Sequence, residues 1–301
     1  MSLEDLETER FHSVISILGN TETMPIRKDK LKVAISTIQK DEEGWYISPS
    51  MFVLSLTNVM LNTRMGEKLP PIYSFMQYIS QDVGNMETIT TRLAWQRDLR
   101  STNQLDFGKW MSYAGCDIDL FHIEARSIFD YLAKITKRLS DQPKQVPDKG
   151  FNFLKTWLAK SDNNVKRVGK DLAELVSSVD WFDDLKNVRD VNVHQGGMTL
   201  VFLEKDRILF QILKGYEHLV SIPEIMYNEN VVDFELYAGM YFGYLIAFLE
   251  DFATAIERRL PKGKYSLGVG NPRKVYRELP AIYSWTKKLL TIEDEITGVK
   301  S

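Results

Sequence analysis

Residues 117–139 read DIDLFHIEARSIFDYLAKITKRL, and their apolar side chains follow a helical spacing. These side chains recur at alternating intervals of three and four residues, at Ile118, Phe121, Ala125, Ile128, Leu132, Ile135 and Leu139. Because a helix turns once in about 3.6 residues, the spacing predicts a helix with one narrow apolar seam, for which Asp117 is the candidate N-cap. Such a helix packs lengthwise against other helices, as in a bundle.

The segments around this helix predict an all-α protein with one inserted β-hairpin. Their patterns predict further helices at 26–38, 51–62, 72–99, 151–159, 165–179, 180–195 and 231–260. The hairpin is expected near 198–213, because two apolar, β-prone runs flank a polar triplet there. We divide the chain into an N-terminal helical region of unknown role at 1–105, a helical bundle at 117–260 and a C-terminal tail at 261–301, with a joint before Asp117.

The C-terminal tail is basic and aromatic. Residues 261–290 carry seven basic residues against one acidic residue, with aromatic residues interleaved at Tyr265, Tyr276, Tyr283 and Trp285. One interpretation is a surface for single-stranded nucleic acid, on which bases stack and cations contact phosphates. The other is a helical end that docks on the body of the protein through the same aromatic side chains.

Composition limits the function classes. The chain has 38 basic and 41 acidic residues, a net charge of −3, which argues against a broad, unspecific nucleic-acid field. The single cysteine, Cys116, excludes an intramolecular disulfide and a cysteine-based metal site. The longest uncharged apolar run, Leu236–Leu249, is too short to span a bilayer, and the first ten residues do not resemble a secretory signal. These features predict a cytoplasmic protein with no membrane association. A GxxxG pair within that run, Gly239 and Gly243, is expected to allow close helix contact.

Common catalytic and cofactor motifs are missing from the sequence. The four histidines, His12, His122, His194 and His218, do not pair at a metal-ligand spacing. There is no GxxxxGK[ST], GxGxxG or GxSxG motif. We therefore expect no cofactor and no metal. His122 lies beside the apolar seam, where a packed structural histidine is expected.

One segment combines residue types that could act together in catalysis: RDVNVH, from Arg189 to His194. A guanidinium binds a phosphate oxygen and keeps its charge, while an imidazole moves protons near neutral pH. The negative end of the helix raises the pKa of a histidine there, which favours a general acid, but it also disfavours an approaching anion. The structural alternative is that Arg189 pairs with a nearby acid such as Asp184 and that His194 simply ends the helix.

Residues 181–197, WFDDLKNVRDVNVHQGG, resemble the motif of the HEPN superfamily, whose members carry Arg-x(4–6)-His. An Asn, Asp or His often follows the Arg directly, and Asp190 takes that position here. The segment FHIEARSIFD at 121–130 is similar to the first bundle helix of that group. The resemblance spans about residues 117–260 and does not extend to residues 1–105.

The resemblance implies a helical bundle that forms a homodimer, so that two Arg–His motifs meet in one cleft. It also implies a metal-independent endoribonuclease that uses the RNA 2′-hydroxyl as nucleophile, in a toxin–antitoxin or other defence system, with an antitoxin or another protein as partner. By the same resemblance Arg189 holds the phosphate, His194 is the acid or base and Asp190 orients them, with Glu124, Asp130 and Asn192 as further candidates. The alternative is a non-catalytic module of the same group that binds a nucleotide, a nucleic acid or a protein partner.

Overall fold

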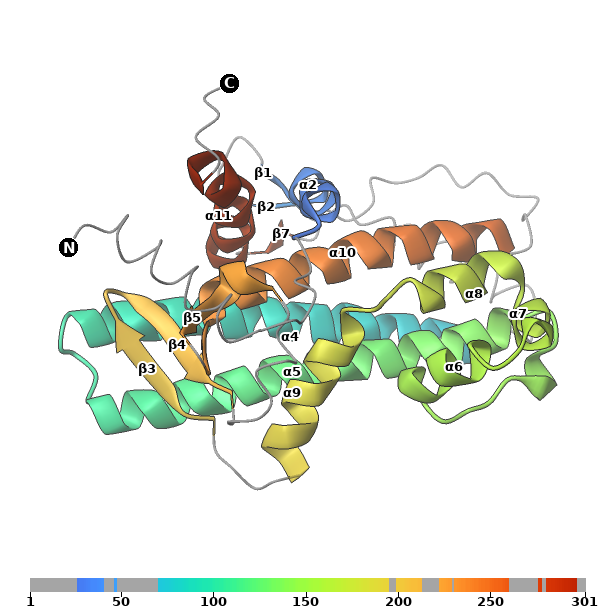
Figure 1. Cartoon of the computed structure of the whole chain (residues 1–301), viewed down its shortest axis with the longest axis horizontal. Helices are drawn as coiled ribbons and strands as arrows, with labels where there is room; N and C mark the ends of the chain where they lie inside the picture. Colours follow the sequence, from blue (N-terminus) through green and yellow to red (C-terminus); the bar gives the residue numbers. More distant parts are fainter. Residues whose placement is uncertain are drawn as a thin grey trace.

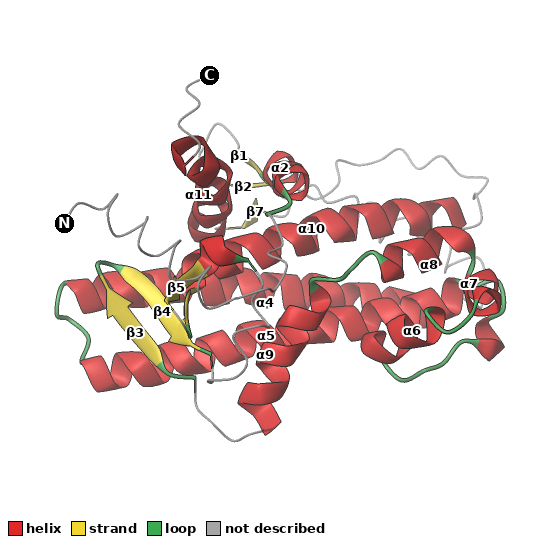
Figure 2. Cartoon of the chain, viewed as in Figure 1, coloured by secondary structure: helices red, strands yellow, loops and turns green. Residues whose placement is uncertain are grey.

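Two long antiparallel helices, α4 (Pro70–Ser101) and α5 (Phe107–Leu139), form the base of the fold (Figure 1). They belong to a computed structural model that describes residues 26–40, 46–47, 70–194, 199–212, 222–228, 230–259, 276–277 and 280–296. A third long helix, α10 (Phe234–Arg259), lies along this hairpin, and the shorter elements pack around these three (Figure 2). The helix predicted at 51–62 lies outside the described residues.

The apolar seam predicted in α5 is confirmed. Six of its seven members are fully buried, and Leu139 packs against the same core from its edge. Aromatic side chains of α10 meet this seam, since the ring centroids of Phe121 and Phe234 lie 5.5 Å apart and those of Phe129 and Phe248 lie 5.9 Å apart. Edge-to-face and offset rings of this kind add to the stability that burial alone provides.

The predicted start of α5 is wrong, because the helix begins ten residues before Asp117. Asp106 is its N-cap, and the Asp106 carboxylate accepts a hydrogen bond of 3.1 Å from the backbone N–H of Lys109. Asp117 lies buried inside the helix instead. Its charge is satisfied by α4, where Arg92 Nε donates to it at 2.8 Å and Gln96 Nε2 at 2.9 Å. The predicted joint is therefore part of a continuous helical hairpin.

Helix α4 runs without interruption through Gly84 and Asn85. Its first residues are Pro70 and Pro71, which are tolerated there because the first N–H groups of a helix have no partner within it. Beyond α5 the chain forms a short helical turn and four shorter helices: η1 (Pro143–Gln145), α6 (Phe151–Leu158), α7 (Asp162–Val168), α8 (Lys170–Ser177) and α9 (Phe182–His194). The single helix predicted at 165–179 is wrong. Gly169 has φ of +94°, which breaks the stretch into α7 and α8.

The hairpin prediction is confirmed, and the structure extends it to a four-stranded antiparallel sheet of order β3-β4-β6-β5. Its strands are β3 (Val201–Glu204), β4 (Arg207–Gln211), β5 (Met226–Asn228) and β6 (Val231–Asp233), with the 3₁₀ turn η3 (Pro223–Ile225) before β5. Because β6 occupies residues predicted as helix, α10 begins only at Phe234. A second sheet pairs the two-residue strands β1 (Gln39–Lys40), β2 (Tyr46–Ile47) and β7 (Tyr276–Arg277). The protein is thus mostly helical with small antiparallel sheets.

Two helices cross α10 at its glycines, α2 (Lys28–Thr37) and α11 (Pro280–Ile296). A Cβ on Gly239 would lie 2.8 Å from the backbone of α11, and one on Gly243 would lie 2.7 Å from a methyl group of Leu31. The close contact predicted for the GxxxG pair is therefore confirmed. Trp285 of α11 is buried, so this part of the tail docks on the body. Residues 261–275 lie outside the described part of the chain. None of the described helices combines the length and apolar character needed to cross a membrane.

Candidate functional site

Helix α9 carries the Arg189–His194 pair, and its inner face is fixed to the bundle. Phe182, Leu185 and Val188 are buried, as the apolar side predicted for this segment requires. In Figure 1 the helix crosses in front of α5, and its last turns extend past that helix in this view. The inner face therefore supports an outer face that can meet a ligand.

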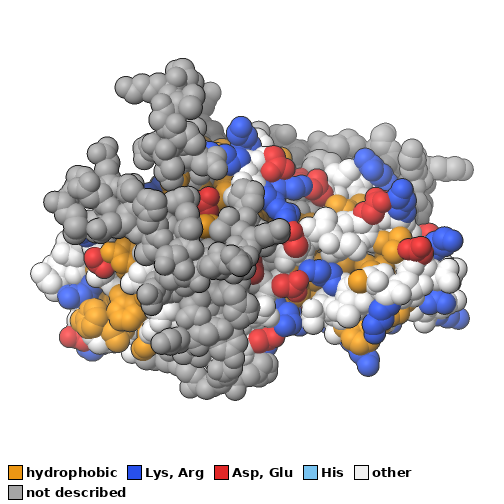
Figure 3. All heavy atoms as spheres, in the orientation of Figure 1, with side chains coloured by type: hydrophobic (Ala, Val, Ile, Leu, Met, Phe, Trp, Pro, Cys, Tyr) orange, Lys and Arg blue, Asp and Glu red, His pale blue; other side chains and the backbone are white. Residues whose placement is uncertain are grey.

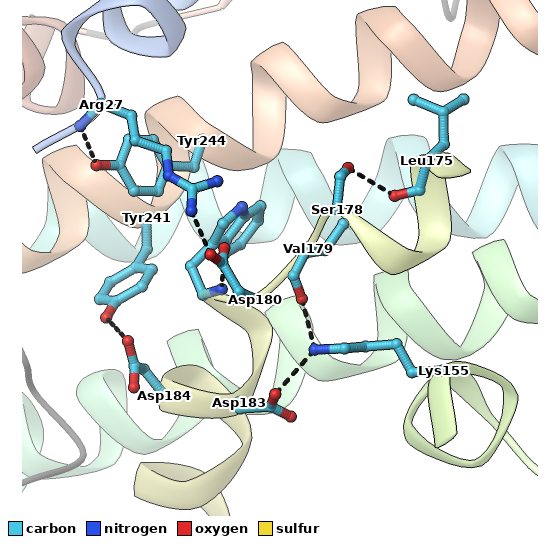
Figure 4. Close-up of polar contacts among 11 residues, drawn as sticks. Arg27, Lys155, Leu175, Ser178, Val179, Asp180, Asp183, Asp184, Tyr241 and Tyr244 are labelled. Carbon is cyan, nitrogen blue, oxygen red and sulfur yellow. Dashed lines mark hydrogen bonds and ion pairs between the residues drawn. The ribbon is translucent and has the colours of Figure 1, made fainter. Parts of the chain in front are cut away.

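The first turn of α9 is held by charged side chains from two other elements (Figure 4). Lys155 of α6 donates to the carbonyl oxygen of Val179 and to the carboxylate of Asp183, both at 2.8 Å. Arg27 pairs with Asp180, whose carboxylate also accepts from the backbone N–H of Trp181 at 2.8 Å. Asp180 therefore lies two residues before the first residue of α9, while Asp183 contacts Lys155.

Asp184 lies on the buried face of α9 and points toward α10 (Figure 4). Its Oδ2 accepts a hydrogen bond of 2.9 Å from the hydroxyl of Tyr241, which is itself buried. Burial raises the pKa of Asp184 to about 7, although the hydrogen bond from Tyr241 opposes the shift. The structural alternative expected Arg189 to pair with a nearby acid such as Asp184. Arg189 does contact a nearby acid, but that acid is Asp190. The structure instead pairs Asp184 with Tyr241.

A second buried polar pair lies next to this one. The Nδ1 of His122 is 2.7 Å from the carbonyl oxygen of Ile118, and its Nε2 is 2.8 Å from the hydroxyl of Tyr237. The carbonyl can only accept, so Nδ1 carries the proton and Nε2 accepts from Tyr237. Burial lowers the pKa of His122 to about 4, which keeps it neutral. The expectation of a packed structural histidine is confirmed.

The outer face of α9 presents Arg189 and its neighbours. Asp190 lies between two cations, with Arg189 Nη1 at 2.9 Å and Lys186 Nζ at 3.2 Å. Partial burial opposes ionisation of Asp190, but these hydrogen bonds and the nearby charge of Arg126 outweigh it and lower the pKa. The Arg189 side chain is 27% exposed and its Nε is buried, so the side chain is only partly accessible while Asp190 holds Nη1.

His194 is the last residue of α9, and it lies on the same helix as Arg189. Five residues of α-helix correspond to about 7.5 Å along the axis and about 140° around it. The two positions therefore lie on different sides of the last turns, and a ligand contacting both must span the helix end. The side chains of His194 and Asn192 lie outside the described part.

Glu124 and Asp130, the two acids among the further candidates, have other contacts. Asp130 accepts a hydrogen bond of 3.0 Å from the backbone N–H of Phe151 at the start of α6, and Arg126 lies 3.4 Å from it. Glu124 lies beside Asp82 of α4, and burial together with the charge of Glu124 raises the pKa of Asp82 to about 7. Asp130 thus supports α6, and Glu124 belongs to a carboxyl pair between α4 and α5.

Lys186 and Arg126 are the charged neighbours of Arg189 that the sequence reasoning missed. Lys186 stands four residues before Asp190, a helical spacing at which opposite charges meet, so the sequence held a signal for it. Arg126 comes from α5, and nothing in the local sequence of α9 points to it.

No protein-family model matches the sequence, and neither curated proteins nor solved structures contain a significant match to it. Within the described residues, no three His, Cys, Asp or Glu side chains gather as ligands of one metal ion. The case for a function therefore depends on α9 and on the helices that hold it.

Proposed function

We propose that this protein is a metal-independent endoribonuclease in which Arg189 and His194 of α9 act on one phosphodiester. The observation that carries the proposal is the placement of both residues on a single helix whose inner face is anchored by Phe182, Leu185 and Val188. Residues on a rigid element hold reacting groups in a fixed geometry, which lowers the entropic part of the barrier.

Local charge also supports the proposal. Lys186 and Arg189 of α9 and Arg126 of α5 lie around Asp190, and Asp130 lies 3.4 Å from Arg126, so three cations stand against these two acids. This excess offsets the negative end of the helix, which would otherwise repel an approaching phosphate. A phosphate oxygen can replace one carboxylate oxygen of Asp190 on Arg189 while Lys186 keeps Asp190 neutralised.

In the proposed reaction the RNA 2′-oxygen forms a bond to the adjacent phosphorus, and the bond from phosphorus to the 5′-oxygen breaks. The 2′-hydroxyl proton passes to a base, and His194 as imidazolium gives a proton to the leaving 5′-oxygen. Arg189 stabilises the charge that develops on the non-bridging oxygens. The products are a 2′,3′-cyclic phosphate and a free 5′-hydroxyl.

The proposal includes a homodimer, because a second copy would supply the second imidazole as base. It also includes a role in a toxin–antitoxin or other defence system, with an antitoxin as protein partner. The alternative, a non-catalytic module that binds a nucleotide, nucleic acid or protein, requires Arg189 for binding and leaves His194 dispensable.

The test is an RNA cleavage assay in EDTA with the purified protein, His194→Ala and Arg189→Ala. Arg258→Ala is the matched control, since Arg258 is an exposed arginine on α10. We expect the wild type and Arg258→Ala to leave 2′,3′-cyclic phosphate ends, and the two α9 variants to lose cleavage while their circular dichroism spectra are unchanged. Cleavage that persists in His194→Ala would refute the proposed chemistry. Binding that needs Arg189 without any turnover would support the non-catalytic module.

A further inference from the structure

One segment of the chain differs strongly in charge from the rest. Residues 134–170 contain ten lysines and arginines against three aspartates, a local net charge of +7 in a protein whose total is −3. The segment covers the last turns of α5, η1, α6, α7 and the start of α8. We call it the basic end.

The basic end gathers at one end of the molecule. α6 and α7 pack on each other and on α5, and the backbone N–H of Gln142 donates to the carbonyl oxygen of Arg167 at 2.9 Å, which joins the loop after α5 to α7. Figure 1 places α6, α7 and α8 together at the right of the view. Figure 3 shows several blue side chains at that end.

Four of these cations have no ion pair or hydrogen bond from their side chains within the described chain, and all four are exposed: Arg138, Lys144, Lys160 and Lys166. They differ in this from Lys137, which lies 3.4 Å from Asp148, and from Lys155, which lies 2.8 Å from Asp183. Charges without an internal partner are not needed to hold the fold. They are available to a polyanion.

One exposed aromatic ring of the basic end stands on α6, with a lysine beside it. Phe153 is 38% exposed although it is large and apolar, and Trp157 lies one helical turn further on the same side, half-buried. The Lys149 ammonium lies 5.0 Å from the centre of the Phe153 ring. Exposed rings flanked by cations are the arrangement in which bases stack while phosphates meet Lys and Arg.

We propose that the basic end, with Phe153 exposed on α6, is a binding surface for single-stranded nucleic acid. The surface adjoins the start of the helix that carries the candidate site, because Lys155 of α6 bonds to the first turn of α9. It deepens the proposed function by holding the RNA that flanks the phosphate at α9, and in that respect it rests on that function. Binding itself requires no cleavage.

An anionic membrane is the other polyanion that such a surface could bind. The small number of exposed rings disfavours membrane binding. Interfacial binding needs a broad apolar face that enters the bilayer. The basic end exposes Phe153 as its only large exposed apolar side chain among the described residues, and Trp157 packs partly against the core. The rings of Phe153 and Trp157 are enough for base stacking, but they do not form an apolar face large enough to enter a bilayer.

The experiment measures binding of a fluorescein-labelled, 2′-O-methylated uridine 12-mer by anisotropy. The methyl group removes the nucleophile, so cleavage cannot interfere. One variant replaces Arg138, Lys144, Lys160 and Lys166 with Gln. Its control replaces four exposed lysines elsewhere, Lys32, Lys109, Lys205 and Lys287, with Gln, so that the change in total charge is identical.

We expect the basic-end variant to bind at least about tenfold more weakly, with the control within about twofold of the wild type. The slope of log K against log salt should fall in magnitude by up to about 2.8, since each lost contact to a single strand contributes about 0.7. Phe153→Ala should weaken binding about fivefold or more. Phe202→Ala, whose ring on β3 is equally exposed at 38%, should not.

Equal binding by the two fourfold variants would overturn the proposal. No binding of the 12-mer by the wild type would also overturn it, and binding of vesicles with 30% phosphatidylserine in that case would identify a membrane surface instead. Failure of the proposed function is separate. Loss of 12-mer binding in the basic-end variant, from a protein that never cleaves RNA, would retain this surface and reject only the catalysis.

Discussion

The hydroxyl of Tyr241 donates a 2.9 Å hydrogen bond to Asp184 Oδ2, and this buried bond joins α10 to the helix that carries Arg189 and His194. Polar groups buried in this way are stable only while they keep their partners. The bond therefore links the packing of the bundle to the position of the candidate site.

Tyr241→Phe removes the donor and leaves the Asp184 carboxyl buried without it. We expect the free energy of unfolding to fall by about 1–3 kcal/mol, the usual penalty for a stranded buried acceptor. Urea unfolding followed by circular dichroism measures it. Tyr113→Phe is the control, since Tyr113 is 53% exposed and its change should stay within about 0.5 kcal/mol. Equal stability of the two variants would show that the Tyr241 bond contributes nothing.

Ionisation of Asp184 should make stability depend on pH. Its folded pKa, about 7, lies above the ordinary value of 3.8, so the folded state holds a proton that the unfolded state releases. Stability from this group is fully present below about pH 4 and is lost as pH rises to about 7. Burial also raises the pKa of Glu235 to about 7, although the charge of Arg97 opposes the shift. Glu235 therefore changes stability in the same direction.

Asp184→Asn isolates that contribution. Asparagine keeps an acceptor for Tyr241 but cannot ionise. We therefore expect the stability of this variant, relative to the wild type, to increase between pH 4 and pH 7 and to level off above pH 7, by of order 1 kcal/mol per pH unit at most. His122, with a pKa lowered to about 4 by burial, changes stability in the opposite direction below about pH 6.5. Because His122 is present in both the wild type and Asp184→Asn, its contribution cancels when their stabilities are subtracted. A pH-independent difference would contradict the assignment.

Gly239 sets the distance between α10 and α11. A Cβ at this position would lie 2.8 Å from the backbone of Trp285 and Thr286, and backbone cannot move aside as a side chain can. Gly239→Ala should therefore lower the free energy of unfolding by about 1–3 kcal/mol, even though alanine favours the helix. Gly108→Ala is the comparison. Its Cβ would approach only the Asp106 carboxylate, at 3.3 Å, and stability should change little.

The sequence predicted correctly those features of the fold that a few neighbouring residues encode. The three-four spacing of α5, the polar turn between β3 and β4 and the Arg189–His194 interval can each be read within a few residues. The errors have distant causes. Asp117 has the residue type of an N-cap, but donors from α4, Arg92 and Gln96, allow it to be buried inside α5.

The candidate site shows the same division between local and distant causes. The position of Arg189 on α9 follows from the sequence. The partner of Asp184 does not, because Tyr241 lies 57 residues further along the chain. Strands β5 and β6 are three residues each, too short to carry an alternating pattern. The pairing of β6 with β4, and of β5 with β6, determines them.

Asp190 tests whether the contact with Arg189 serves catalysis or only balances charge. Asp190→Asn removes one negative charge and the ionic acceptor of Arg189 at 2.9 Å. The affinity for the 2′-O-methylated 12-mer should rise about two- to tenfold at low salt, because phosphate no longer competes with a carboxylate. If Asp190 orients Arg189 during the reaction, kcat should fall about tenfold at the same time, since orientation is lost while binding improves.

Asp251→Asn is the matched control for this split between affinity and rate. Asp251 pairs with Lys30 at 3.0 Å in a similar exposed contact, and it is on α10 rather than on α9. Its substitution changes the total charge equally and should leave both quantities within about twofold. Tighter binding of Asp190→Asn with an unchanged kcat would mean that Asp190 only repels the substrate. Unchanged binding and an unchanged kcat would place the phosphate away from Arg189, because a phosphate seated on that guanidinium cannot be indifferent to the charge beside it.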